Sequence, residues 1–328
     1  MLIFTPSGGR LGNQLISYIH LLSFWQENQS QFDMINLSFW PYSPLLNGQG
    51  SQKYCFHSNS RSRHLFFAFL FFMYTHLPKR YQHKCLSLFT IIFHGFAFFW
   101  PGFNSLFANK NSIQKHIMPF CLGKNYDFLD LSHTKTHFLL SKKHTVFTGF
   151  QIKSWKLVLK HKQATMPLLK PHIQLQNKAT SFMTPIRQKY KTVIGVHIRQ
   201  GDWRRHPKSI TDTGRIAFDA TTYVSYMKQL TSLLGSNIGF ILTSDEEQDM
   251  SLFSEFNVHL CTGSMGQDGH FFESILELSQ CDYLLMPDTT FAGWASFIND
   301  VPMFVVRSET DTLYADKFSK IKDITGFC

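Results

Sequence analysis

The second half of the chain alternates between short apolar runs and longer segments with a helical spacing of apolar residues. Residues 193–198 carry a branched side chain at most positions, which is typical of a strand buried in a parallel sheet. The segments between such runs are long enough for helices that return across a sheet. The pattern predicts strands at 193–198, 238–243, 257–260, 282–286 and 303–306, and helices at 219–234, 246–255, 269–280 and 291–298.

The first residues predict a strand, a glycine-rich loop, a helix and a second strand. Residues 1–5 and 32–37 are strand-like, and apolar residues between 13 and 29 fall close to helical spacing. Glycines in the loop 6–13 let the backbone approach a ligand closely, and the following helix N-terminus favours an anion. A further strand is expected at 145–150.

The length of 328 residues exceeds the usual size of one domain. Residues 171–188 contain two prolines and little periodicity, which indicates a domain boundary. We therefore expect an N-terminal domain at 1–175 and a C-terminal α/β domain, with a doubly wound parallel sheet, at 188–328.

Two very apolar, phenylalanine-rich segments, 65–74 and 86–100, lie in an expected helical insertion at about 60–110. Both are shorter than the ~20 residues that a spanning helix needs. Two interpretations stay open: a buried helical pair, or an in-plane contact with an anionic membrane surface. The flanking basic residues that favour the second are Arg61, Arg63, Lys79, Arg80 and Lys84.

The net charge of +10 and the pI near 9.3 indicate an anionic partner. The basic residues form no long run, and no zinc-finger or RNP-type motif is present, so no nucleic-acid partner is expected. Six cysteines without C-x-x-C spacing predict reduced thiols in a cytoplasmic compartment. The first residues lack the charged and apolar regions of a signal peptide, and none is expected.

Three predicted strands end in polar clusters, and ligands of open parallel sheets bind at that rim. His197 and Arg199 stand two apart, so they project from the same side of their strand. A guanidinium there suits a phosphorylated ligand, because it can meet phosphate oxygens bidentately. The other two clusters are Thr243-Ser244-Asp245 and Asp288-Thr289-Thr290.

Structural roles are the alternative for each cluster. Arg199 and Asp202 are spaced for a local ion pair. Ser244, Asp245 or Asp288 can serve as a helix N-cap.

Four segments of the chain resemble fucosyltransferases. Residues 9–14, Gly-Arg-Leu-Gly-Asn-Gln, are similar to the loop that opens α-1,2-fucosyltransferases and protein O-fucosyltransferases. Residues 197–202, His-Ile-Arg-Gln-Gly-Asp, resemble the H-x-R-x-x-D motif that α-1,2-, α-1,6- and protein O-fucosyltransferases share. Residues 149–151 and 278–294 resemble the piece before the domain crossover and the C-terminal segment of these enzymes.

The resemblance implies a metal-independent, inverting glycosyltransferase of GT-B architecture, with two Rossmann-like domains facing one another across a cleft. It implies GDP-fucose as the donor substrate, a glycan hydroxyl of an oligosaccharide as the acceptor, and no further cofactor. A transferase with another nucleotide-sugar donor, or a non-catalytic basic binding protein on the same fold, is the alternative.

The resemblance also assigns roles within the motifs. Arg199 would hold the β-phosphate, and His197 would lie near the nucleoside. The expected donor-binding residues are Arg10, Gly12, Asn13, His197, Arg199, Ser244, Asp245, Glu273, Thr289, Thr290 and Phe291, and the expected catalytic residues are Arg199, Asp202 and Asn13.

The chemistry of the reaction fits these residues. Negative charge grows on the pyrophosphate as its bond to the sugar breaks, and fixed cations, amides or a metal must stabilise it. The sequence has no D-x-D motif, but it has Arg199 and a Thr-Thr turn before a helix. Asp202, Asp212 and Asp219 all follow the motif and are candidates for the general base. Asp202 is the one expected to act, with the orientation of Arg199 as its alternative role.

One position departs from the family pattern. Relatives usually carry an acidic residue seven positions before Cys281, where it can pair with the guanine edge. This chain has Ser274 there, with Glu273 beside it. We expect Glu273 to take that role through a small rotation of its helix.

Overall fold

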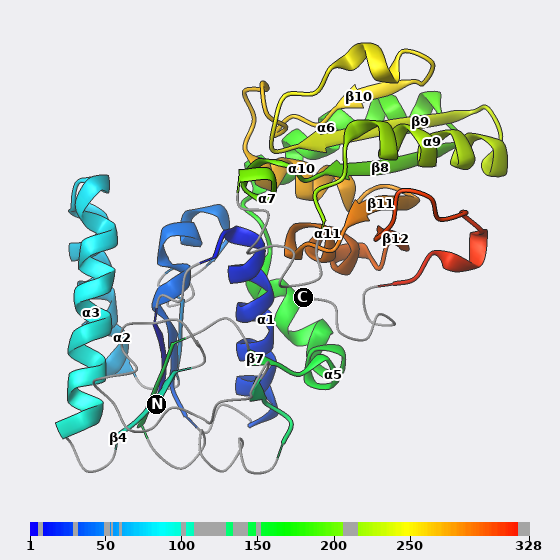
Figure 1. Ribbon diagram of the computed structural model, residues 1–328. Coiled ribbons are helices and arrows are strands. Elements are labelled where there is room, and N and C mark those ends of the chain that lie inside the picture. The colour runs from blue at the N-terminus through cyan, green and yellow to red at the C-terminus, as the bar shows by residue number, and fades with distance from the viewer. Residues whose placement is uncertain are drawn as a thin grey trace. The chain divides into compact units, whose positions relative to one another are not determined.

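The computed structural model describes residues 1–5, 9–28, 32–48, 53, 55–58, 61–99, 103–107, 129–133, 144–148, 152–205 and 216–320 (Figure 1). The chain divides into two compact units, Met1–His172 and Ile173–Cys328. Each unit contains a five-stranded sheet in which parallel pairing dominates, as expected for an α/β protein.

The sheet of the first unit has the strand order β3-β2-β1-β6-β4. All its pairs are parallel except β2 with β3. The helix α3 packs on β1, β4 and β6, and α1 lies on the other side of these strands (Figure 1). The elements are β1 (Leu2–Thr5), α1 (Leu11–Glu27), β2 (Met34–Asn36), β3 (Phe56–His57), α2 (Arg61–His76), α3 (Lys79–Phe99), β4 (Phe103–Phe107), β5 (Leu129–Asp130), β6 (His144–Thr148), β7 (Ile152–Lys153) and α5 (Trp155–Thr165), with 3₁₀ turns at Leu37–Leu45 and Met166–Leu169.

The sheet of the second unit is parallel throughout, with the order β10-β9-β8-β11-β12. The chain therefore starts at the central strand β8, moves outward to one edge, and returns to the other side through β11. The elements are α6 (Ile173–Lys189), β8 (Thr192–Ile198), α7 (Gly201–Arg205), α9 (Ala220–Leu234), β9 (Ile238–Ser244), β10 (Val258–Leu260), α10 (Phe271–Leu278), β11 (Tyr283–Pro287), α11 (Thr290–Asn299) and β12 (Met303–Val306), with 3₁₀ turns at Met250–Phe253 and Ala315–Lys317.

Side chains alternate across β8, and each face has its own cover. Ile194, Val196 and Ile198 are buried in one cluster with Tyr223, Tyr226 and other residues of α9. Gly195 points to the opposite face, toward α10. A Cβ there would lie 2.6 Å from Leu278 Cδ2, so the glycine is what lets α10 pack closely on the strand. His197 and Arg199 share the face of Gly195 by the period of two.

The predicted alternation of strands and helices in the second half is confirmed, with one exception. Residues 246–255 form a 3₁₀ turn at Met250–Phe253, not an α-helix. The polar residues at 244–249 satisfy their hydrogen bonds within the loop: Ser244 Oγ accepts from the Glu246 amide, and Asp249 accepts from the Ser251 amide. Such local side-chain bonds compete with helix formation.

The stretch at 171–188, expected to be irregular, is instead the helix α6. Its buried residues Ala179, Met183 and Ile186 follow the spacing of a helix face, and this face packs on α10. Pro171 precedes the helix, and Pro185 inside it removes one backbone donor without ending it.

The Phe-rich segment is helical as predicted from Arg61 to Phe99, but the prediction is wrong beyond that point. Residues Phe103–Phe107 form the edge strand β4, which pairs with β6 in parallel. No helix in the described part of the chain is long and apolar enough to cross a bilayer. Residues 149–151, which resemble the piece before the domain crossover of fucosyltransferases, lie outside the described residues.

Candidate functional site

The three predicted clusters come together at one rim of the second sheet. Parallel pairing aligns Ile198 with Ser244 at the carboxyl ends of β8 and β9, and it aligns Val196 with Leu285 near the end of β11. The strand β8 is also where the strand order reverses, because β9 lies on one side of it and β11 on the other. Ligands of open α/β sheets bind at such a reversal point.

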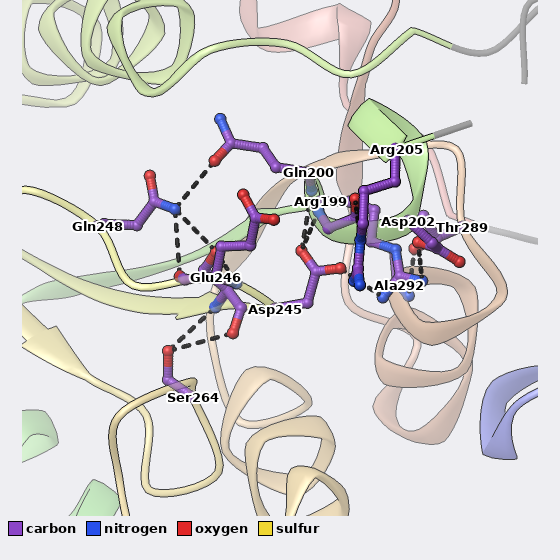
Figure 2. A network of polar contacts seen from close by, with 12 residues as sticks. Arg199, Gln200, Asp202, Arg205, Asp245, Glu246, Gln248, Ser264, Thr289 and Ala292 are labelled. Atoms are coloured by element: carbon purple, nitrogen blue, oxygen red, sulfur yellow. Dashed lines mark hydrogen bonds and ion pairs between the residues drawn. The ribbon is translucent and has the colours of Figure 1, made fainter. Parts of the chain in front are cut away.

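The guanidinium of Arg199 is held between two carboxylates at this rim (Figure 2). Its Nη2 donates to Asp202 Oδ1 at 2.6 Å, and its Nη1 lies 3.0 Å from Asp245 Oδ2. The Arg199 side chain is 16% exposed, so it remains accessible to a ligand. The local Arg199–Asp202 pair expected from the spacing is therefore confirmed, and Asp245 is added to it.

Asp245 fixes the backbone that follows Arg199. Its Oδ1 accepts from the amides of Gln200 at 2.8 Å and Gly201 at 3.3 Å. A Cβ at Gly201 would lie 2.4 Å from Asp245 Oδ2, so a larger residue there would displace the carboxylate. One carboxylate thus joins the end of β9 to both the side chain and the turn after β8.

Ser244 does not cap a helix, and neither does Asp245, so the N-cap interpretation is wrong for both. Ser244 Oγ accepts from the Glu246 amide and from Gln248 Nε2 at 3.1 Å. Gln248 Nε2 also lies 3.0 Å from Gln200 Oε1 (Figure 2). These bonds keep the loop after β9 in contact with the turn after β8.

His197 is buried and stacks on Phe291 in the first turn of α11, with ring centroids 4.6 Å apart. Burial, followed by the positive charge of Arg199, lowers the pKa of His197 to about 4. The imidazole is therefore neutral near pH 7, and Arg199 alone of this pair supplies positive charge. Neither ring nitrogen of His197 has a hydrogen-bond partner of normal geometry within the described residues, and both nitrogens are shielded from solvent.

The third cluster forms the start of α11. Thr289 is its N-cap, and Thr289 Oγ1 accepts from the Ala292 amide at 3.1 Å. Asp288 precedes the cap and lies 3.8 Å from Arg307 Nη2. The N-cap is therefore Thr289, one residue later than Asp288, which was the alternative interpretation. The amide of Phe291 is among the first-turn donors that have no acceptor within the helix, and Thr289 lies beside Arg199 in Figure 2.

A small pocket opens at the same rim. Pro287 and Val306 end two strands in its wall, and Trp203 of α7 closes another side. Hydrophobic side chains, together with the charged Asp288 and Arg307, thus line the rim on the side of β12.

Glu273 and Ser274 lie at the start of α10, and both are buried. The Ser274 hydroxyl accepts from the Gly263 amide at 3.1 Å, so it holds the loop after β10. Glu273 Oε1 accepts from Lys178 Nζ at 3.0 Å, and its Oε2 accepts from Thr262 Oγ1 at 3.1 Å. The contact with Lys178 could not be predicted from the sequence, because Lys178 lies far away along the chain on α6.

Glu277 shares Thr262 with Glu273. Its carboxyl lies 2.5 Å from Thr262 Oγ1 and accepts from the Thr262 amide at 3.0 Å. A hydroxyl has one proton, so it cannot donate to both carboxyl groups at once. Burial raises the pKa of Glu277, and the hydrogen bonds from Thr262 oppose that shift.

The remaining expected residues, Arg10, Gly12 and Asn13, lie at the N-terminus of α1 in the first unit. Arg10 is exposed and occupies the N-cap position without a side-chain cap bond. Gly9 has a φ of +86°, and a Cβ there would lie 2.6 Å from Asn13 Nδ2. Glycine is therefore needed both for the backbone conformation and for the position of Asn13.

In the described parts of the chain, no group of three or more His, Cys, Asp or Glu residues is arranged to hold a metal ion. The groups that gather at the rim are a guanidinium, two carboxylates, an imidazole and a helix N-terminus. The guanidinium and the helix N-terminus, at the reversal point of a parallel sheet in an α/β protein, are groups that can bind an anionic ligand, as they do in nucleotide-dependent enzymes.

Residues 125–325 match the family model described as glycosyl transferase family 11. The match covers more than half of the chain, and the chain belongs to this family, which is a family of fucosyltransferases. No curated protein sequence matches the chain significantly.

Solved fucosyltransferase structures are similar to the chain at low sequence identity. A mutant of Arabidopsis thaliana FUT1 in complex with GDP is 10% identical, with a TM-score of 0.50 over 97% of this chain and 73% of that chain. POFUT1 in complex with GDP is 14% identical, with a TM-score of 0.48 over 92% of this chain and 95% of that chain. NodZ from Bradyrhizobium is 11% identical, with a TM-score of 0.47 over 93% and 94%.

The contacts of Asp245 predict that it positions Arg199. Replacing Asp245 by Asn keeps an oxygen for the Gln200 and Gly201 amides but removes the charge that faces Nη1. We expect Asp245→Asn to lower kcat for fucose transfer by roughly 100-fold, because a small misplacement of a catalytic group has effects of this size. Steady-state kinetics should show a smaller change in the donor KM.

The neighbouring Glu246→Gln is the matched control, since Glu246 contacts Arg204 at the edge of the network. It should retain near-normal turnover. Equal losses in both variants, or a large fall in the melting temperature of Asp245→Asn, would contradict a positioning role.

Proposed function

We propose that the chain transfers fucose from GDP-fucose to a hydroxyl group of an oligosaccharide, with inversion at the sugar and without a metal ion. Membership of glycosyl transferase family 11 supports fucose as the transferred sugar. The nucleotide is taken as GDP because the similarly folded Arabidopsis FUT1 was solved with GDP. The observation that carries the proposal is the fixed guanidinium of Arg199 at the strand-order reversal, beside the N-terminus of α11.

Arg199 and α11 stabilise the leaving group in this proposal. As the bond between the sugar and the pyrophosphate breaks, negative charge accumulates on the phosphate oxygens. The two ion pairs use one N–H on each terminal nitrogen of Arg199, so the Nε–H and a second N–H on each terminal nitrogen can point to phosphate. Thr289, Thr290 and the amide of Phe291 add donors from the positive end of the helix.

His197 binds the nucleoside portion of the donor. It is neutral, it lies two residues before Arg199, and its stacking on Phe291 fixes the plane of the ring. A neutral imidazole can donate from one nitrogen and accept at the other, which suits ribose hydroxyl groups. Ser244 and Asp245 position the adjoining loop and Arg199 rather than carrying the charge of the ligand themselves.

Asp202 carries two proposed roles. Its Oδ1 pairs with Arg199 at 2.6 Å, which supports an orienting role. Its side chain is 38% exposed, so the carboxylate can also receive the acceptor proton as general base. Arg10, Gly12 and Asn13 at the N-terminus of α1 are further proposed donor-binding residues.

Glu273 is proposed to read the guanine edge. A carboxylate can accept from both the ring N–H and the exocyclic amine of guanine, whereas the edge of uracil differs. Ser274 is fully buried and bound to the loop, so it cannot serve. Glu273 is buried beneath Lys178, whose side chain is 63% exposed and can turn toward solvent when a base approaches. No rotation of α10 is required by this proposal.

The first prediction from the proposed function concerns the geometry of the Arg199 guanidinium. Arg199→Ala should remove most transferase activity, and Arg199→Lys should restore little, because an ammonium does not reproduce the planar fork. Initial rates with GDP-fucose and a panel of oligosaccharides measure this, with circular dichroism as the check on folding. A lysine variant with near-normal turnover would show that the phosphate role is wrong.

The second prediction concerns recognition of the nucleotide base by Glu273. Glu273→Gln should weaken GDP binding about tenfold or more, since a neutral amide leaves one guanine donor without an acceptor. Lys178→Met is the matched control: it breaks the ion pair with Glu273 but keeps the carboxylate, so GDP binding should hold or tighten. Isothermal titration of both variants and the wild type against GDP and UDP makes the comparison.

Equal weakening in both variants would mean that the Lys178–Glu273 pair is structural. Wild-type binding of UDP as tight as that of GDP would favour another nucleotide-sugar donor.

The third prediction concerns metal dependence. If Arg199 and the start of α11 stabilise the leaving group, fucose transfer should persist in excess EDTA at an unchanged rate. Assays of EDTA-treated enzyme with and without added magnesium or manganese test this. A strict requirement for either ion would reject the metal-free part of the proposal while leaving the donor assignment intact.

A further inference from the structure

The helices α2 and α3 form a hairpin in the first unit, joined by a turn at Leu77 and Pro78 (Figure 1). Their inner faces are buried. Trp40 contacts the rings of Phe71, Tyr74 and Phe89 at centroid distances of 5.2, 5.4 and 6.1 Å. The hairpin is therefore packed firmly onto its own unit by one side of each helix.

The outer faces of the hairpin are also apolar, although they meet solvent. On α2 the exposed side chains recur at helical spacing, with Leu65 72% and Phe69 59% exposed, followed by Phe72. On α3 they include Leu88 and Ile91, the latter 65% exposed. We call this surface the outer hairpin face; its apolar residues are Leu65, Phe66, Phe69, Phe72, Met73, Tyr81, Leu88, Ile91 and Ile92.

Such a surface is unusual for a helix pair at the edge of a protein. A surface helix normally turns charged residues to water, and a helix that is apolar on all sides is covered by something. Nine large apolar side chains gathered on two adjacent helices mark a surface that binds a partner.

The charges on the hairpin indicate which partner. Residues 61–99 contain five Lys or Arg and no Asp or Glu. Lys79 and Arg80 are exposed at the turn between the helices, and Arg80 lies over the ring of Tyr81 at 4.7 Å. Lys84 is exposed on the same stripe of α3 as Tyr81 and Leu88. A protein partner of ordinary composition gives no reason to exclude every acidic residue, whereas an anionic lipid surface does.

Neither helix of the hairpin is both long and apolar enough to cross a bilayer, although α3 has 21 residues, so the helices fit a contact in the plane of the membrane. The 16 residues of α2 extend roughly 24 Å, less than the hydrocarbon thickness of about 30 Å. Aromatic rings and leucines can enter the boundary between headgroups and acyl chains, while Lys84 extends its ammonium back to the phosphates. We propose that the outer hairpin face docks the enzyme on an anionic membrane surface, with α2 and α3 lying parallel to the bilayer.

Sedimentation of the full chain with lipid vesicles tests the proposal. The wild type should partition at least tenfold more strongly onto phosphatidylcholine vesicles with about 30% phosphatidylglycerol than onto pure phosphatidylcholine, and less strongly in high salt. A triple variant, Phe66→Ser, Phe69→Ser and Phe72→Ser, should lose binding to both. Serine at the exposed positions Leu159, Ile173 and Leu233 is the matched control and should leave vesicle binding unchanged.

A charge variant separates the two contributions. Lys79→Glu, Arg80→Glu and Lys84→Glu together should reduce binding to anionic vesicles at least 100-fold, since each basic residue near such a surface contributes roughly a fivefold gain. GDP titration should be unaffected in the phenylalanine and charge variants, because none of the substituted residues belongs to the proposed donor site; this keeps a folding defect distinguishable.

Three results would overturn the proposal. If the wild-type protein stays in the supernatant with all vesicles, the chain has no surface that binds membranes. Vesicle binding that survives the triple phenylalanine variant takes place elsewhere on the chain. A concentration-dependent dimer that the same variant abolishes, without any vesicle binding, would assign the outer hairpin face to a second copy of the chain.

Discussion

The pairing of one partly buried guanidinium with two carboxylates governs the architecture of the second unit. Arg199 must be compensated, because removing one partner of a buried charge pair is strongly destabilising. Asp202 comes from the same turn, but Asp245 comes from the neighbouring strand, and it reaches Arg199 only in the register that aligns Ile198 with Ser244. The register of β8 and β9, the glycine at position 201 and the charge compensation of Arg199 by Asp245 therefore depend on one another.

This arrangement prepares the rim for an anion before one arrives. A guanidinium fixed by two carboxylates loses little freedom on binding phosphate, and pre-oriented groups stabilise developing charge most effectively. The neutral His197 adds directed hydrogen bonding without a second positive charge. In the proposed reaction, the remaining N–H groups of Arg199 and the first amides of α11 are therefore the donors that the leaving group would meet.

The sequence predicts what is local and periodic, and it misses what depends on distant contacts. Strands in the second unit were predictable because branched residues form short buried runs, and parallel pairing then brought their polar ends to one rim. The helix α6 was not predicted, because Pro185 disfavours a helix and the buried residues that favour one form only a short stripe. The burial of that stripe depends on packing against α10, which the sequence does not reveal. The partners of Glu273 could not be foreseen, since Lys178 reaches it only through that packing.

The Phe-rich hairpin shows how two interpretations of one pattern can describe two faces of the same helices. The burial expected for a helical pair holds for the inner faces around Trp40, and the apolar exposure expected for a membrane contact holds for the outer faces. A hydrophobic stripe on one side would have sufficed to fold the unit. The exposed phenylalanines on the other side carry a cost in water, and the lack of any acidic residue from 61 to 99 is a second departure on the same hairpin. An anionic lipid surface accounts for both departures at once, because it accepts apolar side chains and attracts the basic residues beside them.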